Sequence, residues 1–327
     1  MLNESWQRFT DDSSTWDNLC ERFNGNHRQL YGWGKYQAEK GWSIARYVFY
    51  SGNEIKYALQ LLYKKKFFFT AIYIPGGVLG ELSGYSPNLK ELVKELFPRS
   101  FYYLRLDSSY DYSKNHHKLF LDSGYKIPLF QMNSKDRYII NLKELTKGHF
   151  QNSSSNFRKN IKKSYKNINH IHIGFPIADD EIEATSASMQ TFKKIKLRDN
   201  PKNIVNIISY LKKRIIIVTA KDENRKMLGF RCAILFNGVA YDKYAANTEL
   251  GRKKLAGFAI LDSIIMECKK LGAKCYLLPT SLQNKGDREF KRSTGGSLSQ
   301  SMDEYETTNL PFMMTVINLV LYFKYKL

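Results

Sequence analysis

Cysteine is scarce in this sequence, with four residues in a chain of 327 and no two of them in C-x-x-C spacing. Paired cysteines at that spacing are the usual mark of a zinc or redox site, so the sequence gives little support for either. A chain of this length also does not need a disulfide scaffold to hold its fold together. We therefore expect reduced thiols, no metal site and a cytoplasmic location.

Long apolar runs are also missing. Residues 1–17 are polar and of mixed charge, without the apolar core of a signal peptide. The most apolar stretch, residues 310–323, is shorter than the roughly 18–20 residues that span a bilayer, and it contains Asn318. We expect no transmembrane segment and interpret this stretch as a packed terminal helix. A peripheral contact with the inner face of a membrane is the lesser alternative.

Motifs that hold nucleotides are absent as well. The sequence has no Walker P-loop and no G-x-G-x-x-G dinucleotide fingerprint. No Ser-His-Asp, Cys-His or metal-ligand set stands out, and His170 and His172 have no carboxylate nearby in the sequence. These absences favour chemistry by positioning and electrostatics over a covalent nucleophile. We expect no tightly bound cofactor.

Positive charge is what the sequence has in excess. It contains 51 Lys and Arg against 31 Asp and Glu, a formal net charge of +20. A field of this sign attracts anions such as nucleic acid, phosphorylated substrates or anionic membrane faces. A genome that favours lysine everywhere would give the same total, so clustering of the cations decides between the two interpretations.

Strand-like and helix-like segments alternate through both halves of the chain, which predicts an α/β (α+β) fold. Residues 42–50 and 54–62 predict a hairpin, and residues 138–142 predict the strand that ends the first half. Residues 143–155 are polar and mark a junction. We therefore predict two domains, residues 1–150 and residues 151–307, each long enough to bury its own core.

The densest cationic cluster lies in a predicted helix over residues 156–165. Its cations recur at helical spacing on one face, namely Arg158, Lys159, Lys162, Lys163 and Lys166. No acidic residue between positions 151 and 178 offsets them, although like charges so spaced destabilise a helix by roughly a few tenths of a kcal/mol per pair. A phosphate-bearing ligand would explain them: a nucleotide, a lipid pyrophosphate or tRNA. A solvated basic face is the alternative.

Two further basic segments lie next to predicted secondary structure. Residues 251–258 precede a long amphipathic helix, whose N-terminal N–H groups favour an anion. This segment is similar to the R-x-x-G-x-G/A pyrophosphate loop of GNAT acyltransferases, with Leu255 at the first glycine position; a charged turn is the alternative. Within residues 287–296, Lys291 follows a predicted strand, where a lysine could stabilise a developing oxyanion; taken alone, this segment is only a basic loop.

Several short motifs resemble, in order along the chain, the FemABX-type aminoacyl- and acyltransferases. The matching segments are spread over most of the length: 31–33 with 41–42, 73–77, 103–107, 130–131 with 138–142, 158–163, and 290–291 with 295–296. Ser108 and Thr294 depart from the family pattern, which has proline and phenylalanine there. The resemblance implies two GNAT-like domains, each a mixed, mostly antiparallel sheet flanked by helices. It also implies that residues 308–327 return to the first domain.

The resemblance also implies roles for individual residues. In members that use aminoacyl-tRNA, the acceptor amine attacks an ester carbonyl. Lys291 would then stabilise the oxyanion, Phe290 would shape the pocket, and Asp107 would orient or deprotonate the amine. Residues expected to bind substrate are Lys35, Gln37, Tyr73, Arg105, Arg158, Lys162, Lys194, Tyr241, Arg252 and Lys253.

Two of these positions depart from the family in a way that bears on the acceptor. Gln37 stands where the family has a lysine that contacts phosphate, with Lys35 or Lys40 as substitutes. Lys194 stands where the family has an arginine, with Arg198 as the alternative, and lysine lacks the bidentate geometry of arginine. We expect an acceptor different from the peptidoglycan precursor used by the best-known members.

The predicted function is transfer of an aminoacyl or acyl group from aminoacyl-tRNA to an amino group of a phosphorylated or lipid-linked cell-envelope precursor. The charge favours tRNA, because RNA binding is driven by phosphate neutralisation. One alternative is an N-acyltransferase that uses acyl-coenzyme A and acts on an amino sugar of a surface polysaccharide. Another is a non-catalytic module that binds RNA or a membrane surface.

Overall fold

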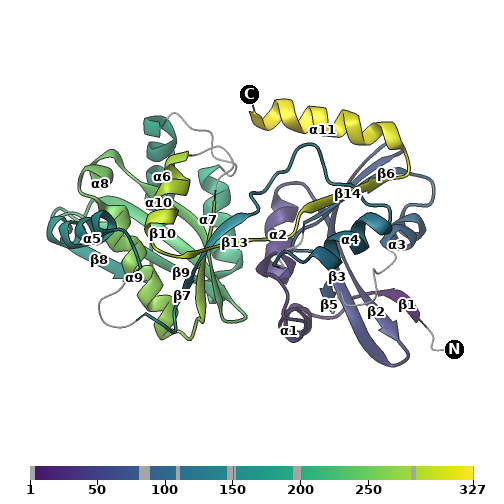
Figure 1. Ribbon diagram of the computed structural model, residues 1–327, viewed down its shortest axis with the longest axis horizontal. Coiled ribbons are helices and arrows are strands. Elements are labelled where there is room, and N and C mark those ends of the chain that lie inside the picture. Colours follow the sequence, from purple (N-terminus) through teal and green to yellow (C-terminus); the bar gives the residue numbers. More distant parts are fainter. Residues whose placement is uncertain are drawn as a thin grey trace. The chain divides into compact units, whose positions relative to one another are not determined.

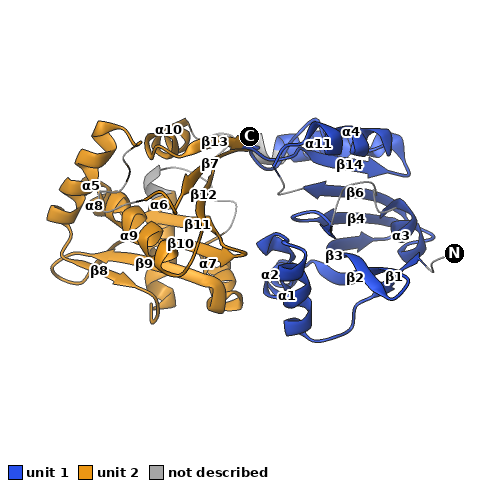
Figure 2. Ribbon diagram, turned by 60° about the horizontal axis from the view of Figure 1, so that its bottom comes forward, with its two compact units in different colours: residues 1–135, 300–327 blue, residues 136–299 orange. Residues whose placement is uncertain are grey.

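The computed structural model describes residues 4–80, 89–107, 111–145, 150, 152–193, 200–280 and 285–326. Lys194 and Arg198 lie outside these ranges. The chain divides into two compact units, one formed by residues 1–135 and 300–327 and the other by residues 136–299 (Figure 2). We call them unit 1 and unit 2 and describe each by itself.

Unit 1 is built on a seven-stranded sheet in the order β1-β2-β3-β4-β6-β14, with β5 paired to β3 (Figure 1). All neighbours are antiparallel except β4 and β6, which are parallel. The strands are β1 (Glu4–Arg8), β2 (Ser43–Ser51), β3 (Glu54–Lys66), β4 (Phe69–Ile74), β5 (Leu79–Gly80), β6 (Phe101–Asp107) and β14 (Glu304–Thr308).

Some helices of unit 1 pack on its sheet through an apolar face. The helical face of Leu89, Leu92 and Val93 is buried, and it packs with Phe120 against the strands. The helices are α1 (Ser13–Arg22), η1 (His27–Gln29), α2 (Tyr31–Glu39), α3 (Leu89–Leu96), α4 (Lys114–Asp122) and α11 (Pro311–Lys326).

Unit 2 repeats this theme with a seven-stranded sheet in the order β13-β7-β12-β11-β10-β9-β8. Strand β11 pairs with β12 in parallel and is connected to it through α9, as β4 and β6 of unit 1 are connected through α3. The strands are β7 (Asp136–Asn141), β8 (His170–Ile173), β9 (Ile215–Lys221), β10 (Met227–Phe236), β11 (Val239–Asn247), β12 (Cys275–Pro279) and β13 (Ser297–Gln300).

The core of unit 2 centres on α9, whose buried side chains pack with those of β9, β10 and α5. Strand β10 is buried along nearly its whole length, which is why its sequence is a continuous apolar run broken by Arg231. The helices are α5 (Ser155–Asn167), α6 (Asp179–Lys193), α7 (Pro201–Tyr210), η2 (Lys212–Arg214), α8 (Glu249–Lys253), α9 (Ala256–Lys270) and α10 (Lys285–Ser293).

The predicted fold class is confirmed: each unit is a mixed, mostly antiparallel sheet with flanking helices. The division of the chain differs from the predicted boundaries of 1–150 and 151–307. Strand β7 pairs with β12, and Tyr138 and Ile140 are buried in the core of unit 2, so this strand begins unit 2 and does not end unit 1. The return to unit 1 starts at residue 300 and not at 308, because β14 pairs with β6.

The C-terminal stretch forms helix α11, as predicted, but it is not packed as expected. Asn318 is buried, whereas large apolar side chains of the helix are exposed, among them Phe312, Val320 and Phe323 at 62, 59 and 57%. Among the residues that the structure describes, no helix is long and apolar enough to cross a membrane.

Candidate functional site

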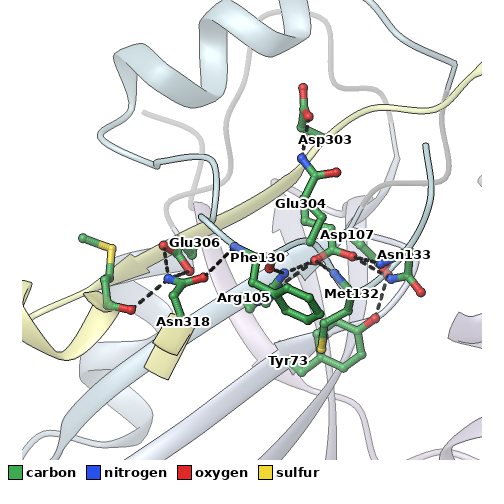
Figure 3. Close-up of polar contacts among 12 residues, drawn as sticks. Tyr73, Arg105, Asp107, Phe130, Met132, Asn133, Asp303, Glu304, Glu306 and Asn318 are labelled. Carbon is green, nitrogen blue, oxygen red and sulfur yellow. Dashed lines mark hydrogen bonds and ion pairs between the residues drawn. The ribbon is translucent and has the colours of Figure 1, made fainter. Parts of the chain in front are cut away.

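The polar centre of unit 1 is the carboxylate of Asp107, at the end of β6 (Figure 3). It is 4% exposed and accepts four hydrogen bonds. Arg28 Nη1, Tyr73 Oη and Asn133 Nδ2 donate to Oδ2 at 2.5, 2.6 and 2.8 Å, and the Gly76 N–H donates to Oδ1 at 2.6 Å. We call these five residues the Asp107 cluster.

Strand pairing assembles this cluster. Because β4 and β6 are parallel and in register, with Tyr73 opposite Arg105, both strands end at the same edge of the sheet. The chain then turns sharply at Gly76, where φ is +83°. Glycine adopts this left-handed conformation without strain, and the turn points its N–H at the carboxylate.

A second carboxylate, Glu304 of β14, supports the Asp107 cluster from the neighbouring strand. Its Oε2 accepts from Arg105 Nε at 2.8 Å, and its Oε1 accepts from Asn133 N and Nδ2 at 2.7 and 2.8 Å. Arg105 Nη2 also donates to the Phe130 carbonyl at 2.5 Å. The Asn133 side chain therefore bridges the two carboxylates by donating a hydrogen bond to each. The N–H groups of Arg105 donate to acceptors inside unit 1.

Burial and pairing shift the pKa of two neighbours of Asp107, Tyr73 and Arg28. Burial and the neighbouring Asp107 raise the pKa of Tyr73 well above its usual value, so its hydroxyl stays a donor. Burial lowers the pKa of Arg28, but the Asp107 carboxylate outweighs it and leaves that pKa raised. A carboxylate has about four lone-pair positions, two on each oxygen. Three of the donors to Asp107 reach Oδ2, whereas Oδ1 accepts only the Gly76 N–H among the described residues, which leaves a position on Oδ1 for a further donor.

Unit 2 contains a corresponding buried cluster on three neighbouring strands, β10, β11 and β12. Arg231 of β10 binds Asp242 of β11 in a fork, with Nε–Oδ1 at 2.6 Å and Nη2–Oδ2 at 3.0 Å. Tyr276 Oη of β12 donates to the same Oδ1 at 2.8 Å. The pairing of β11 with β12 runs only from Val239 to Tyr241, so Asp242 is the first residue of β11 beyond this pairing.

Burial and charge pairing together determine the direction of the pKa shifts of Asp242 and Tyr276. Burial would raise the pKa of Asp242, but the guanidinium of Arg231 outweighs burial and leaves that pKa below its usual value. The pKa of Tyr276 is well above its usual value because the hydroxyl is buried and lies next to Asp242. The three groups are therefore a carboxylate, a guanidinium and a neutral phenol near neutral pH.

Helix α10 adds the predicted catalytic pair to this cluster. Lys291 is 8% exposed, and its Nζ lies 2.9 Å from Asp287 Oδ2 and 2.5 Å from the Pro279 carbonyl oxygen at the end of β12. The ring of Phe290 lies 5.9 Å from the guanidinium carbon of Arg231. It also packs edge-on against Phe258 with centroids 5.3 Å apart. We call Arg231, Asp242, Tyr276, Asp287 and Lys291 the Lys291 cluster.

Solved structures share this architecture over nearly the whole chain. FemX, 13% identical, aligns with a TM-score of 0.79 over 95% of this chain and 100% of its own. The chain has the tandem GNAT-like fold of FemX. L-PGS from Bacillus licheniformis, 15% identical, aligns at 0.58 over 94 and 96% of the two chains. A tandem GNAT protein from the clavulanic acid biosynthesis pathway, 8% identical, aligns at 0.56 over 94 and 98%.

Comparison by sequence finds no relatives of this chain, whereas comparison by structure does. No family model matches the sequence. No curated protein matches it either. The resemblance predicted from short motifs is therefore confirmed through the FemX-like fold. At these identities the likeness establishes the fold and leaves the activity to be argued from the residues.

The remaining residues predicted to bind substrate lie in several different parts of the structure. In unit 1, Lys35 is exposed with its Nζ 5.4 Å from the ring of Tyr31, and Gln37 is half-buried on the same helix. Lys40, the substitute for Gln37, has its Nζ 5.2 Å from the ring of Tyr36. These three side chains belong to α2 and its C-terminus, outside the Asp107 cluster.

The cationic face of α5 lies on the surface of unit 2. Lys159, Lys162, Lys163 and Lys166 are exposed, whereas Phe157 and Ser164 on the opposite side are buried. Arg158 is turned back to the start of the helix, where its Nη1 donates to the Phe150 carbonyl at 3.4 Å and to the Ser153 carbonyl. Four of the five predicted cations are thus presented to solvent.

The basic segment before α9 is a turn between two helices. Leu255 has a φ of +63°, the left-handed conformation that a glycine would adopt with less strain. Lys253 pairs with Glu249 at 2.9 Å, and Arg252 is exposed. Among the N–H groups that begin α9, that of Ala259 is already bound to Ser164 Oγ at 3.0 Å. Tyr241 ends the parallel pairing beside Leu277.

Sequence reasoning missed most of the residues that hold the two clusters. Arg28, Asn133 and Glu304 were not predicted, and neither were Arg231, Asp242 and Tyr276. A signal existed for Arg231, which is a charged residue inside an apolar strand sequence and so requires a buried partner. The partner itself could not be identified, because that depends on the strand register.

Proposed function

We propose that this protein is an acyltransferase that forms an amide from an activated acyl or aminoacyl ester and an amine. The observation that carries the proposal is Lys291, a buried lysine fixed at the end of β12 in a FemX-like fold. An ammonium group has three protons, and two of those of Lys291 have acceptors among the described residues. The third has no acceptor within the described part of the chain, and we assign it to a ligand oxygen.

The proposed reaction needs little more than placed charge. The amine nitrogen attacks the ester carbonyl, the carbon–nitrogen bond forms, and the ester carbon–oxygen bond breaks as the amine proton passes to the departing oxygen. Lys291 stabilises the negative charge that develops on the carbonyl oxygen, and Asp287 and the Pro279 carbonyl hold its Nζ in place. Phe290 contributes an apolar wall beside Arg231.

The proposed donor is an aminoacyl-tRNA. Unit 2 holds 31 Lys and Arg against 15 Asp and Glu, whereas unit 1 holds 20 against 16. The excess charge is therefore concentrated in the unit that carries Lys291 and the exposed cationic face of α5. Such a surface suits a polyanion, because each neutralised phosphate releases bound counterions.

The proposed acceptor is an amine of a phosphorylated or lipid-linked cell-envelope precursor. In unit 1, the Asp107 carboxylate suits an ammonium or amine group, and Arg28, with 20% of its side chain exposed, suits a neighbouring anion. Acyl-coenzyme A as the donor, and a non-catalytic RNA-binding role, are the competing functions.

The experiment is a transfer assay with Lys291→Met against Lys285→Met, an exposed lysine of the same helix. Loss of the oxyanion donor should lower the rate of amide formation by about 10²–10³-fold, whereas Lys285→Met should leave it unchanged. Both variants are checked for an unchanged melting temperature. A folded Lys291→Met variant with full activity would exclude the assigned role.

A further inference from the structure

The turn between β3 and β4 carries an unusual exposed surface. Its sequence is Lys64-Lys65-Lys66-Phe67-Phe68-Phe69, and Phe67 and Phe68 are 81 and 68% exposed. Soluble proteins seldom present adjacent aromatic side chains to water unless something covers them. Phe67 has a φ of +53°, which a bulky residue adopts at a cost in conformational energy. The sequence therefore retains a large apolar side chain at a position that favours glycine or asparagine.

We call the exposed rings of Phe67 and Phe68 the aromatic tip, and neighbouring segments extend it. The Phe101 N–H donates to the Phe68 carbonyl at 2.7 Å, and the ring of Phe101, 45% exposed, packs edge-on against that of Phe68 with centroids 6.4 Å apart. Asn309, just before α11, accepts from the Tyr102 N–H at 2.8 Å and donates to the Ser100 carbonyl at 3.1 Å.

Helix α11 consequently begins next to the aromatic tip. Its first exposed aromatic residue is Phe312, and the exposed side chains of Val316, Leu319, Val320 and Phe323 follow at helical spacing on one face. Asn318 is the polar side chain directed inward, where its Nδ2 donates to Glu306 Oε1 at 2.8 Å. The helix thus turns its polar residue toward the sheet and an apolar face toward solvent.

The charges around the aromatic tip are of one sign. Lys65, Lys66 and Arg99 are exposed and make no ion pair within the part of the chain that the structure describes. No acidic residue occurs between positions 61 and 80, and none between 307 and 327. Exposed aromatic rings flanked by lysines suit the headgroup region of an anionic bilayer, where rings enter the apolar layer and cations meet lipid phosphates.

We infer that the aromatic tip, with Phe101 and the start of α11, is a docking surface for an anionic lipid bilayer. A second copy of the chain would bring Lys65, Lys66 and Arg99 of two molecules together, so like charges disfavour that occupant. The inference does not depend on the proposed function, because binding is measured without a donor or an acceptor.

The test is sedimentation of the full chain with vesicles of phosphatidylcholine alone or of phosphatidylcholine and phosphatidylglycerol at 3:1. We expect at least tenfold tighter binding to the anionic vesicles. Phe67→Asn with Phe68→Ser should weaken that binding at least tenfold, and asparagine tolerates the backbone of position 67. Lys65→Gln with Lys66→Gln should weaken it several-fold. Leu271→Ser, an apolar residue 51% exposed in unit 2, should have no effect.

A second readout separates insertion from electrostatic adsorption. The emission of a Phe67→Trp variant should shift to shorter wavelength when anionic vesicles are added. An unshifted emission, or unchanged binding by the double phenylalanine variant, would overturn the inference. So would self-association in the absence of lipid that the double phenylalanine variant abolishes, since the occupant would then be a second copy.

Discussion

Charged residues in the two clusters are stabilised in their buried positions by hydrogen-bonded partners. Asp242 and Arg231 are both nearly inaccessible, with 8 and 6% of their side chains exposed, and their fork-shaped contact is completed by Tyr276. Removing one member of such a pair leaves an uncompensated buried charge, which typically costs about 3–5 kcal/mol. The pair is therefore needed for stability as well as for shaping the surroundings of Lys291.

This pairing predicts a specific pH dependence of stability. The pKa of Asp242 is lowered in the folded protein, so its contribution is complete above the unfolded value of about 3.9 and is lost as pH falls through the lower folded value. Asp242→Asn should reduce the free energy of unfolding at pH 7 and should flatten its decline below about pH 4.

Urea unfolding of both proteins between pH 3 and pH 7 measures this dependence. Asp136→Asn, a half-buried aspartate of β7, serves as the control for loss of one carboxylate. If the wild type and Asp242→Asn lost stability in parallel over the acid range, the charge pairing of Asp242 with Arg231 would not be the cause.

At the level of elements, the sequence specified helices better than strand partners. The 3.6-residue pattern located α3, α5 and α9 because each presents one apolar face to a core. The assignment of the strand at residues 138–142 to the first domain was wrong, because alternation marks a strand without saying which sheet it joins. The Arg231–Asp242 pair depends on a register shift between Cys232 and Ala233 in the β10–β11 hairpin, which no local pattern encodes.

The Asp107 cluster was partly predictable for a related reason. The motifs around Tyr73 and Asp107 pointed to the ends of β4 and β6, and parallel pairing brings those ends together. Arg28 lies 79 residues before Asp107 in the chain and Glu304 comes from the returning C-terminal segment. Contacts that span such distances follow from the tertiary fold and not from spacing along the sequence.

Helix α5 gives the element-scale prediction. Lys159→Gln, Lys162→Gln and Lys163→Gln together should weaken tRNA binding and reduce the slope of log affinity against log salt by about 2–3, because about 0.7–0.9 of slope is lost per phosphate contact. These side chains are exposed, so stability should change by less than about 0.5 kcal/mol per substitution. Fluorescence titrations of the protein with tRNA at a series of salt concentrations measure the slope.

A matched triple variant controls for net charge in the same unit. Lys202→Gln, Lys213→Gln and Lys226→Gln remove three exposed cations of unit 2 outside α5. Equal losses of affinity and slope in both variants would show that tRNA responds to the overall field and that the face of α5 has no special part in binding.

At the scale of the whole molecule, the two units share an architecture but differ in net charge and in exposed aromatic surface. Both are built on a seven-stranded sheet that contains a parallel pair, and each places a buried carboxylate–arginine cluster at the end of that pair. Unit 2 carries most of the net positive charge, and unit 1 carries the aromatic tip. This division agrees with the two proposals made above, a polyanionic donor bound by unit 2 and a bilayer contacted by unit 1.

The most direct test of acyl transfer is detection of the amide product by mass spectrometry. The full chain is incubated with isotope-labelled aminoacyl-tRNAs, and separately with acyl-coenzyme A, in the presence of amine-bearing envelope precursors. The account predicts a labelled amide from an aminoacyl-tRNA at a rate that depends on Lys291. A product from acyl-coenzyme A alone would contradict the proposed donor, and no amide from any pair, with the folded protein still binding tRNA, would contradict the proposed chemistry.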